Sequence, residues 1–289
     1  MNSHKSKLTR VKESLCITVL TVILLTVFFL RPASAIVWGE LDVKRHPNVG
    51  AIVYRMEAGG ELYPGASGTL IDKKVFLTAG HVTNWFEYLI SQDELEIENI
   101  YICFDSTDTL IPTANLLPVE SIITHPNLRF YKENWYDVGL IILKNEVNDD
   151  ITPAQLPDPE LLDQLKAERE LKSGPKGTRF VCVGYGSFME FPPPRVVWEN
   201  KDRYMAESGY LGLKKSWLIM SQNHPSGYEG TGYGDSGGPI FWRDGDGNEI
   251  LVAVTSKGDP NLVATNIAYR VDTPEILGFI TGINAAVNE

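Results

Sequence analysis

"GYGDSGGP" (Gly232–Pro239) surrounds a single serine, Ser236, with four glycines and one proline. That composition suits a loop whose backbone takes unusual dihedral angles and approaches a ligand closely. A serine hydroxyl in such a loop can act as a nucleophile while neighbouring amides face an oxyanion. The alternative interpretation is a plain glycine-rich turn before the apolar segment that follows.

A serine hydroxyl is a poor nucleophile without a base, and His81 is the best candidate for that base. It ends the segment "VFLTAGH" (Val75–His81), which we interpret as a buried strand running into a bend of small residues. A strand end is a rigid platform for a catalytic group. We expect solvated side chains for the remaining histidines of the chain beyond residue 35, which lie in polar loop segments: His46, His125 and His224.

The base needs a partner that orients it, and Asp137 is the candidate. It lies between Tyr136 and the apolar segment "VGLIILK" (Val138–Lys144). A carboxylate at the start of such a strand is costly to bury without a partner. Paired with His81, it would hold the imidazole tautomer and stabilise the imidazolium. The alternative is a strand-capping aspartate on the surface.

Short segments rich in Val, Ile, Phe and Tyr recur along the chain and are separated by turns, which indicates an all-β sandwich or barrel. "DGDGN" (Asp244–Asn248) predicts a hairpin turn between two of them. Its acidic spacing faintly resembles a calcium loop, but no Glu occupies the far end, so we expect no metal and no cofactor. Residues 157–174 predict a surface helix, and residues 273–287 predict a C-terminal helix that docks on the core.

Three motifs stand in the order found in trypsin/chymotrypsin-type serine proteases, and the chain resembles that family. They are "LTAGH" (Leu77–His81), "YDVGLIIL" (Tyr136–Leu143) and "GDSGGP" (Gly234–Pro239). The resemblance runs from Ile36 nearly to the C-terminus. It implies two packed six-stranded antiparallel β-barrels with the site in the cleft between them.

The resemblance also implies the role of each site residue. Ser236 would be the nucleophile, His81 the base and Asp137 its orienting partner. The backbone amides of Gly234 and Ser236 would form the oxyanion hole. The function implied is a secreted serine endopeptidase; the alternative is a catalytically silent relative that acts as a secreted binding or regulatory protein.

Residues 1–35 are typical of a secretory signal peptide. Basic residues precede the uncharged "LCITVLTVILLTVFFL" (Leu15–Leu30), and "ASA" (Ala33–Ala35) offers the small residues that signal peptidase requires. The uncharged run is shorter than the roughly 20 residues of a spanning helix. We therefore expect residues 36–289 to form the exported protease domain, secreted or periplasmic, with an uncleaved membrane anchor as the alternative.

Cleavage after Ala35 would make Ile36 the first residue of the mature protein. In the family that the chain resembles, the mature chain begins with Ile-Val, and its α-ammonium pairs with the acid before the catalytic serine. Here that acid is Asp235. The resemblance therefore implies an Ile36–Asp235 ion pair and predicts that export and activation are one cleavage.

The charge of the chain narrows the choice of partners. Loss of residues 1–35 removes five of the 26 basic residues and one of the 37 acidic residues, which leaves a net charge of −15. That charge argues against nucleic acid or an anionic membrane as a partner. We expect a monomer whose partners are a polypeptide substrate and a protein protease inhibitor.

The specificity pocket departs from that of trypsin. The resemblance places its floor at Gly230 and Thr231 and its wall at Thr255 and Lys257. Trypsin has an aspartate at the floor, where this chain has glycine, so the preferred cleavage-site residue stays open.

The cysteines also depart from the family pattern. Ala66 and Val82 stand where the family has the cysteine pair that brackets the catalytic histidine. Cys103 and Cys182 allow at most one disulfide, and the sequence leaves open whether they meet. These departures favour a divergent, bacterial member of the family.

Overall fold

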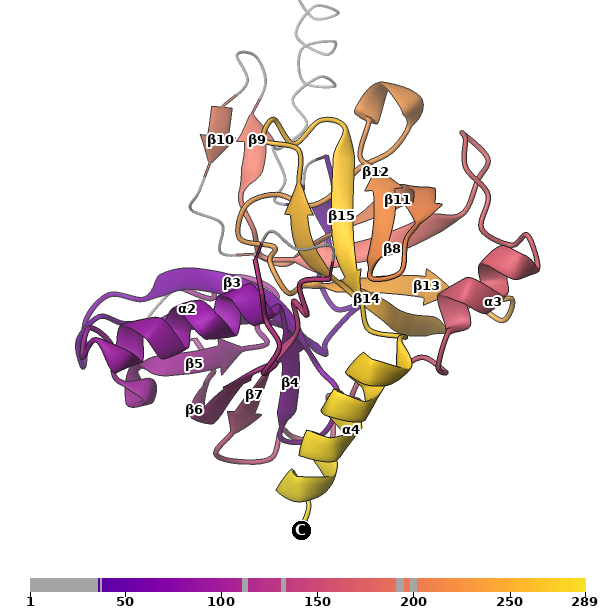
Figure 1. Cartoon of the computed structure of the whole chain (residues 1–289). Coiled ribbons are helices and arrows are strands. Elements are labelled where there is room, and N and C mark those ends of the chain that lie inside the picture. Colours follow the sequence, from indigo (N-terminus) through magenta and orange to yellow (C-terminus); the bar gives the residue numbers. More distant parts are fainter. Residues whose placement is uncertain (1–35, 37, 111–113, 131–133, 191–194, 198–201) are drawn as a thin grey trace, which may run out of the picture. The chain divides into compact units, whose positions relative to one another are not determined.

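A computed structural model describes residue 36 and residues 38–110, 114–130, 134–190, 195–197 and 202–289. The predicted signal peptide lies outside these described residues. Two antiparallel barrels hold most of the strands (Figure 1). The prediction of two packed six-stranded barrels is therefore confirmed.

The first barrel is closed, with the strand order β2-β3-β4-β7-β6-β5. Its strands are built from segments with many β-branched residues, and every residue of β4 and β7 is buried. One apolar cluster, which includes Phe76 and Phe86, fills its interior. The strands are β2 (Val49–Tyr54), β3 (Tyr63–Leu70), β4 (Val75–Thr78), β5 (Ile100–Cys103), β6 (Leu116–Thr124) and β7 (Gly139–Leu143).

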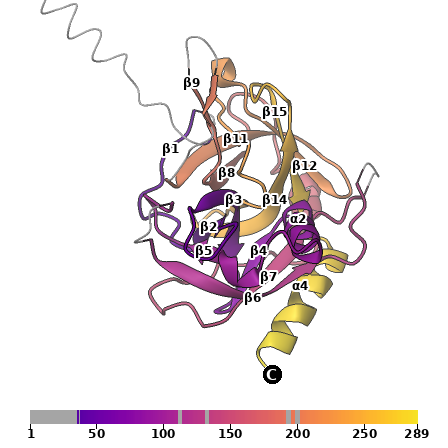
Figure 2. The ribbon, with the colours of Figure 1, turned by 90° about the vertical axis from the view of Figure 1, so that its left-hand side faces the viewer.

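The second barrel has the order β11-β12-β15-β14-β13-β8 and closes through the pairing of β11 with β8. A short strand, β1 (Glu40–Leu41), adds to the edge of β11 (Figure 2). The barrel strands are β8 (Arg179–Gly184), β11 (Tyr204–Leu213), β12 (Trp217–Ser221), β13 (Pro239–Arg243), β14 (Glu249–Gly258) and β15 (Thr265–Arg270). β9 (Phe188–Glu190) and β10 (Arg195–Val197) pair with each other.

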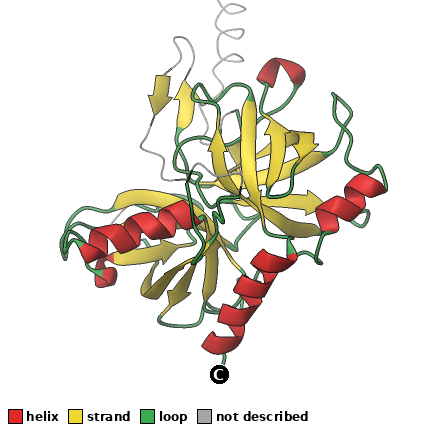
Figure 3. Cartoon of the chain, viewed as in Figure 1, coloured by secondary structure: helices red, strands yellow, loops and turns green. Residues whose placement is uncertain are grey.

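Helices lie outside the barrels (Figure 3). They are α2 (Gly80–Ser91), α3 (Leu161–Ala167) and α4 (Pro274–Val287), with 3-10 turns η1 (Ile97–Asn99) and η2 (His224–Ser226). The C-terminal helix is confirmed, because α4 buries Ile276, Leu277 and Ile280. The helix predicted over residues 157–174 is shorter than expected, since Glu160 has a left-handed backbone and α3 starts after it. No helix among the described residues has the length and apolar character needed to span a membrane.

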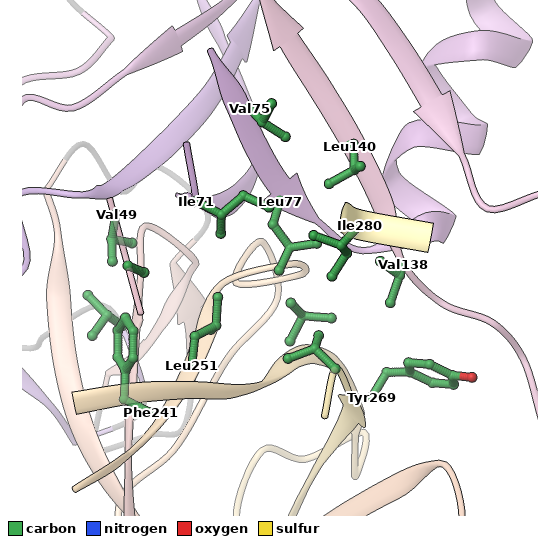
Figure 4. Packing of buried hydrophobic residues seen from close by; sticks show 14 of the residues in the cluster. Val49, Ile71, Val75, Leu77, Val138, Leu140, Phe241, Leu251, Tyr269 and Ile280 are labelled. Carbon is green, nitrogen blue, oxygen red and sulfur yellow. The ribbon is translucent and has the colours of Figure 1, made fainter. Parts of the chain in front are cut away.

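A shared apolar cluster holds the two barrels and α4 together. Figure 4 shows side chains of the first barrel, such as Leu77, converging with Leu251 and Tyr269 of the second barrel and Ile280 of α4. Burial of each such side chain contributes roughly 1.5–3 kcal/mol. The two barrels and α4 therefore share one apolar core.

A buried charged network crosses the same junction. The Arg203 guanidinium is 1% exposed, donates from Nε to Asp42 Oδ2 at 2.6 Å, and donates from Nη1 to the Val49 and Phe104 carbonyls at 3.0 Å. His46 bridges Asp42, through Nδ1, and Glu249 Oε2, which lies 2.7 Å from Nε2. The His46 imidazole is therefore hydrogen-bonded to two carboxylates, one at each ring nitrogen.

The expectation that His46 and His125 are solvated is wrong, because each is 4% exposed. Their sequence neighbours are polar, but His46 is enclosed by two acids, and the His125 ring stacks on Tyr136. His224 is exposed, as expected, and stacks on Trp38.

The cysteine question is resolved for the described residues, where Cys103 and Cys182 are both free and buried. They lie in different barrels, and burial raises the pKa of each thiol to about 12. Ala66 and Val82 pack in one apolar cluster. Side-chain packing thus takes the place of a cross-link beside His81.

The hydrogen-bonded His46 imidazole should make the free energy of unfolding depend on pH. Burial alone would lower the pKa of His46, but Asp42 and Glu249 raise it above its usual value. The stabilisation is therefore complete below about pH 6.5 and is lost as pH rises through the raised pKa. We expect His46→Gln to lower the free energy of unfolding by about 3 kcal/mol at pH 6 and by less at pH 9, measured by chemical denaturation. His224→Gln is the control, and equal pH dependence in the two variants would contradict the assignment.

Candidate active site

Asp137 follows a strained residue, Tyr136, in the segment just before β7. Tyr136 has a positive φ of 53°, and the Val138 amide donates to its carbonyl at 2.8 Å. Such a backbone costs about 1–3 kcal/mol in a non-glycine residue and persists only where its surroundings enforce it. The His125 ring, 4.8 Å from the Tyr136 ring between centroids, supplies part of that enforcement.

His81 lies in the first turn of α2, and not at a strand end as the sequence predicted. Its backbone amide donates to Asp137 Oδ1 at 2.7 Å, and its Nδ1 lies 3.0 Å from both carboxylate oxygens. Gly80 makes this possible, because a Cβ there would lie 2.8 Å from the Val138 nitrogen. The helix start therefore rests directly on the segment that carries Asp137.

The Asp137 carboxylate is fully buried and fully paired. The Ser256 hydroxyl of β14 donates to Oδ2, in addition to the two donors from His81. Burial alone would raise the pKa of Asp137, but the neighbouring His81 and the hydrogen bonds from His81 and Ser256 lower it. An ionised carboxylate only accepts, so a neutral His81 ring carries its proton on Nδ1, and its Nε2 is then an acceptor.

Sequence reasoning missed Ser256. It selected Thr255 and Lys257, the residues on either side, as pocket residues. The signal was present, because Ser256 stands between Thr255 and Lys257, which the resemblance places in the pocket wall. Its hydroxyl reaches from the second barrel to a carboxylate of the first.

The Ser236 loop packs against the segment that leads to His81. The Ser67 amide of β3 donates to the Ser236 carbonyl at 3.0 Å, and the Gly237 amide donates to the Thr255 carbonyl at 2.8 Å. Gly237 has a φ of 80°, and a Cβ there would lie 2.6 Å from the Ala79 nitrogen. Among the hydrogen bonds of the described residues, none joins the Ser236 hydroxyl to the His81 ring.

Two backbone amides of the loop are free to bind a ligand. Within the described part of the chain, neither the Gly234 amide nor the Ser236 amide donates to a protein acceptor. Gly234 has a φ of 91°, and its carbonyl accepts from the Ser67 hydroxyl at 3.3 Å. Such donors can stabilise developing negative charge when they converge on it.

Asp235 is buried without a cation. Its carboxylate accepts from the Gly186 amide at 2.8 Å and the Gly232 amide at 2.7 Å, and burial raises its pKa to about 7. No ion pair to Asp235 forms among the residues that the structure describes. Ile36 is buried, but its nitrogen belongs to a peptide bond in the uncleaved chain, and its carbonyl accepts from the Gly39 amide at 2.9 Å.

The predicted pocket residues are polar and uncharged, apart from Lys257. The Thr231 hydroxyl donates to Asn266 Oδ1 at 3.0 Å. Lys257 Nζ lies over two indoles, 3.9 Å from the ring centre of Trp135 and 4.0 Å from that of Trp217. Burial lowers the pKa of Lys257, and the indole faces stabilise its charge. Neither tryptophan was selected from the sequence.

Removal of the Ser256 hydroxyl should destabilise the protein. A hydrogen bond to a buried carboxylate contributes roughly 1.5–3 kcal/mol, so we expect Ser256→Ala to lower the free energy of unfolding by about 2 kcal/mol at pH 7. Chemical denaturation measures the change, with Ser91→Ala, which removes an exposed hydroxyl, as the control. A Ser256→Ala effect no larger than that of the control would show that the bond contributes nothing.

A comparison with protein families identifies the chain's relatives. The model of the trypsin family matches residues 43–276, which is well over half of the chain. The match covers all strands of both barrels and the segments that carry His81, Asp137 and Ser236. The chain therefore belongs to the trypsin/chymotrypsin-like serine protease family.

Proposed function

We propose that this chain is a secreted serine endopeptidase whose catalytic residues are Ser236, His81 and Asp137. The observation that carries the proposal is the buried Asp137 carboxylate, which holds His81 Nδ1 at 3.0 Å and leaves Nε2 to accept a proton. The Ser236 loop lies beside the same segment of chain. Its two free amides supply the donors that acyl transfer needs.

The reaction follows from these groups. Ser236 Oγ attacks the carbonyl carbon of the peptide, and its proton passes to His81 Nε2. The amides of Gly234 and Ser236 bind the oxyanion of the tetrahedral intermediate. His81 then donates the proton to the leaving amine, and a water molecule hydrolyses the acyl-enzyme by the same route. Asp137 stays ionised throughout and stabilises the imidazolium.

Asp235 supports the proposed activation by removal of residues 1–35. Its buried carboxylate has a pKa raised to about 7 and no described cationic partner. A new α-ammonium at Ile36, with a reference pKa near 8, would provide one. Loss of a buried partner typically costs about 3–5 kcal/mol, which is enough to hold the Ser236 loop in one conformation. Export would then produce active enzyme without a separate propeptide.

The proposed setting follows from the same features. The protein would act outside the cytoplasm on polypeptides, as a monomer without a cofactor, and a protein inhibitor would be its regulatory partner. With a net charge of −15 after cleavage, it would not bind nucleic acid or anionic membranes.

Covalent labelling tests the catalytic assignment. We expect a fluorophosphonate probe to label the exported protein, and Ser236→Ala to abolish labelling, because the probe reacts only with an activated serine. Asp137→Asn should lower peptide hydrolysis about ten-thousand-fold, which is the loss that the same change causes in the chymotrypsin-type triad. Ser226→Ala, at an exposed serine, is the control. A well-folded protein that resists the probe would instead be the silent binding or regulatory relative.

The activation model predicts the first residue of the active protein. N-terminal sequencing of the exported protein should start at Ile36. One additional residue before Ile36 should reduce activity by at least about a hundredfold, because it moves the ammonium away from Asp235. An additional residue after Glu289 is the matched control. Full activity with the N-terminal addition would refute the ion pair.

A further inference from the structure

Gln222 is a buried glutamine whose side-chain amide is unsatisfied. It is 0% exposed, and neither Oε1 nor Nε2 has a hydrogen-bond partner among the described residues. An unpaired buried polar group costs about 1–3 kcal/mol, and this side chain carries two. Native structures keep such groups rarely, and a binding role is one reason.

The Gln222 side-chain amide fills the space that a side chain at Gly230 would occupy. Gln222 directly follows β12, and the backbone amide of Gln222 donates to the Ala264 carbonyl at 3.0 Å. A Cβ at Gly230 would lie 3.0 Å from Gln222 Cδ and would collide with Oε1. Gln222 therefore presents its amide where a side chain at position 230, the predicted pocket floor, would stand.

The groups that the structure describes next to Gln222 are neutral. A Cβ at Gly258, which follows the predicted pocket wall, would lie 4.0 Å from Nε2. Gly258 pairs in the sheet with Asn266, whose Oδ1 already accepts from Thr231. The Thr255 hydroxyl is buried and has no partner among the described groups. The pocket groups named here are neutral donors and acceptors, whereas the charged Nζ of the predicted wall residue Lys257 lies against Trp135 and Trp217.

The nearest acid in the sequence does not change this picture. Glu229 precedes Gly230, but its electrostatic contacts are with Glu207, Glu40 and Arg179. It makes no hydrogen bond to Gln222 within the described structure. The carboxylate therefore does not take the place of trypsin's floor aspartate.

We propose that Gln222 determines cleavage-site specificity and selects a neutral amide side chain, glutamine or asparagine, on the carbonyl side of the cleaved bond. The proposal rests on the proposed endopeptidase function and deepens it. Gln222 Nε2 would donate to the carbonyl of the substrate amide, and Oε1 would accept from its NH₂ group. A single substrate side-chain amide would then form hydrogen bonds with both buried atoms, Nε2 and Oε1 of Gln222.

Other side chains satisfy the site less well. A carboxylate accepts from Nε2 but faces Oε1 with negative charge. A lysine or arginine donates to Oε1 but leaves Nε2 unpaired, and its charge is buried without a counterion. A hydrocarbon side chain satisfies neither atom. A site built to hydrogen-bond its substrate rejects analogues that lack the bonding groups.

A matched peptide series tests the proposal. The full chain is expressed in an exporting host, the exported protein is purified, and kcat/KM is measured on fluorogenic peptides that differ only in Gln, Asn, Glu, Leu or Arg before the cleaved bond. We expect kcat/KM for the best amide peptide to exceed those for Glu, Leu and Arg by on the order of tenfold to a hundredfold. Preference of the unaltered protein for Glu, Leu or Arg would overturn the proposal without any variant.

Two substitutions examine Gln222 directly. Gln222→Met keeps the size, removes both polar atoms, and should shift preference toward Leu. Gln222→Glu keeps the shape, adds charge, and should shift preference toward Arg. Gln164→Met, at an exposed glutamine of α3, is the control and should keep the original preference. Unchanged preference in both folded Gln222 variants would show that the residue plays no part.

Fluorophosphonate labelling distinguishes failure of the Gln222 specificity proposal from failure of the proposed endopeptidase function. A protein that labels but does not prefer amide side chains retains the endopeptidase assignment and refutes the role of Gln222. A folded protein that neither labels nor cleaves any peptide refutes the endopeptidase function, and the specificity proposal with it.

Discussion

A carboxylate with no exposed surface needs hydrogen-bond donors, and at Asp137 these donors come from two parts of the chain. β7 and the strained Tyr136 deliver the carboxylate, the start of α2 brings two donors of His81, and β14 of the other barrel brings the Ser256 hydroxyl. Because removal of one donor leaves buried charge unpaired, these elements are held in one arrangement. The bonds between His81 and Asp137 orient the imidazole, and the Ser256 bond ties the same carboxylate to the second barrel.

Apolar packing and buried charge have different roles at this junction. The cluster around Leu77, Leu251 and Ile280 supplies most of the burial energy, which is non-directional. The bonds of Arg203 and His46 have fixed geometry, so they specify how the surfaces are aligned. Together these interactions hold the segment that carries His81 against the Ser236 loop.

Most of the fold could be predicted from the sequence, because strands such as Gly139–Leu143 and Phe180–Gly184 read as continuous apolar runs. β11 was not found, since Glu207, Gly209 and Gly212 interrupt its pattern. α2 was not found, because its first residues resemble a bend of small residues. In both cases tertiary contacts outweigh local preference.

In the candidate site too, residues in local motifs were predicted, and residues positioned by tertiary contacts were not. Asp137, His81 and Ser236 were predicted because each lies in a motif that can be recognised locally. Ser256 was passed over beside two selected residues, and Gln222 gave no signal at all. Its position depends on an empty volume at Gly230, eight residues further along the chain, and only the folded backbone brings the two together.

The burial of Arg203 has a consequence for how the chain matures. Its guanidinium satisfies a carboxylate 161 residues earlier in the sequence, as well as carbonyls at the ends of two first-barrel strands. Because a polypeptide is synthesised from its N-terminus, Asp42 and the whole first barrel are made before their common partner, Arg203. Until then those groups must stay hydrated, so the first barrel cannot reach its final state alone. The buried contacts of Arg203 therefore form late, because they need a residue that is made after the whole first barrel.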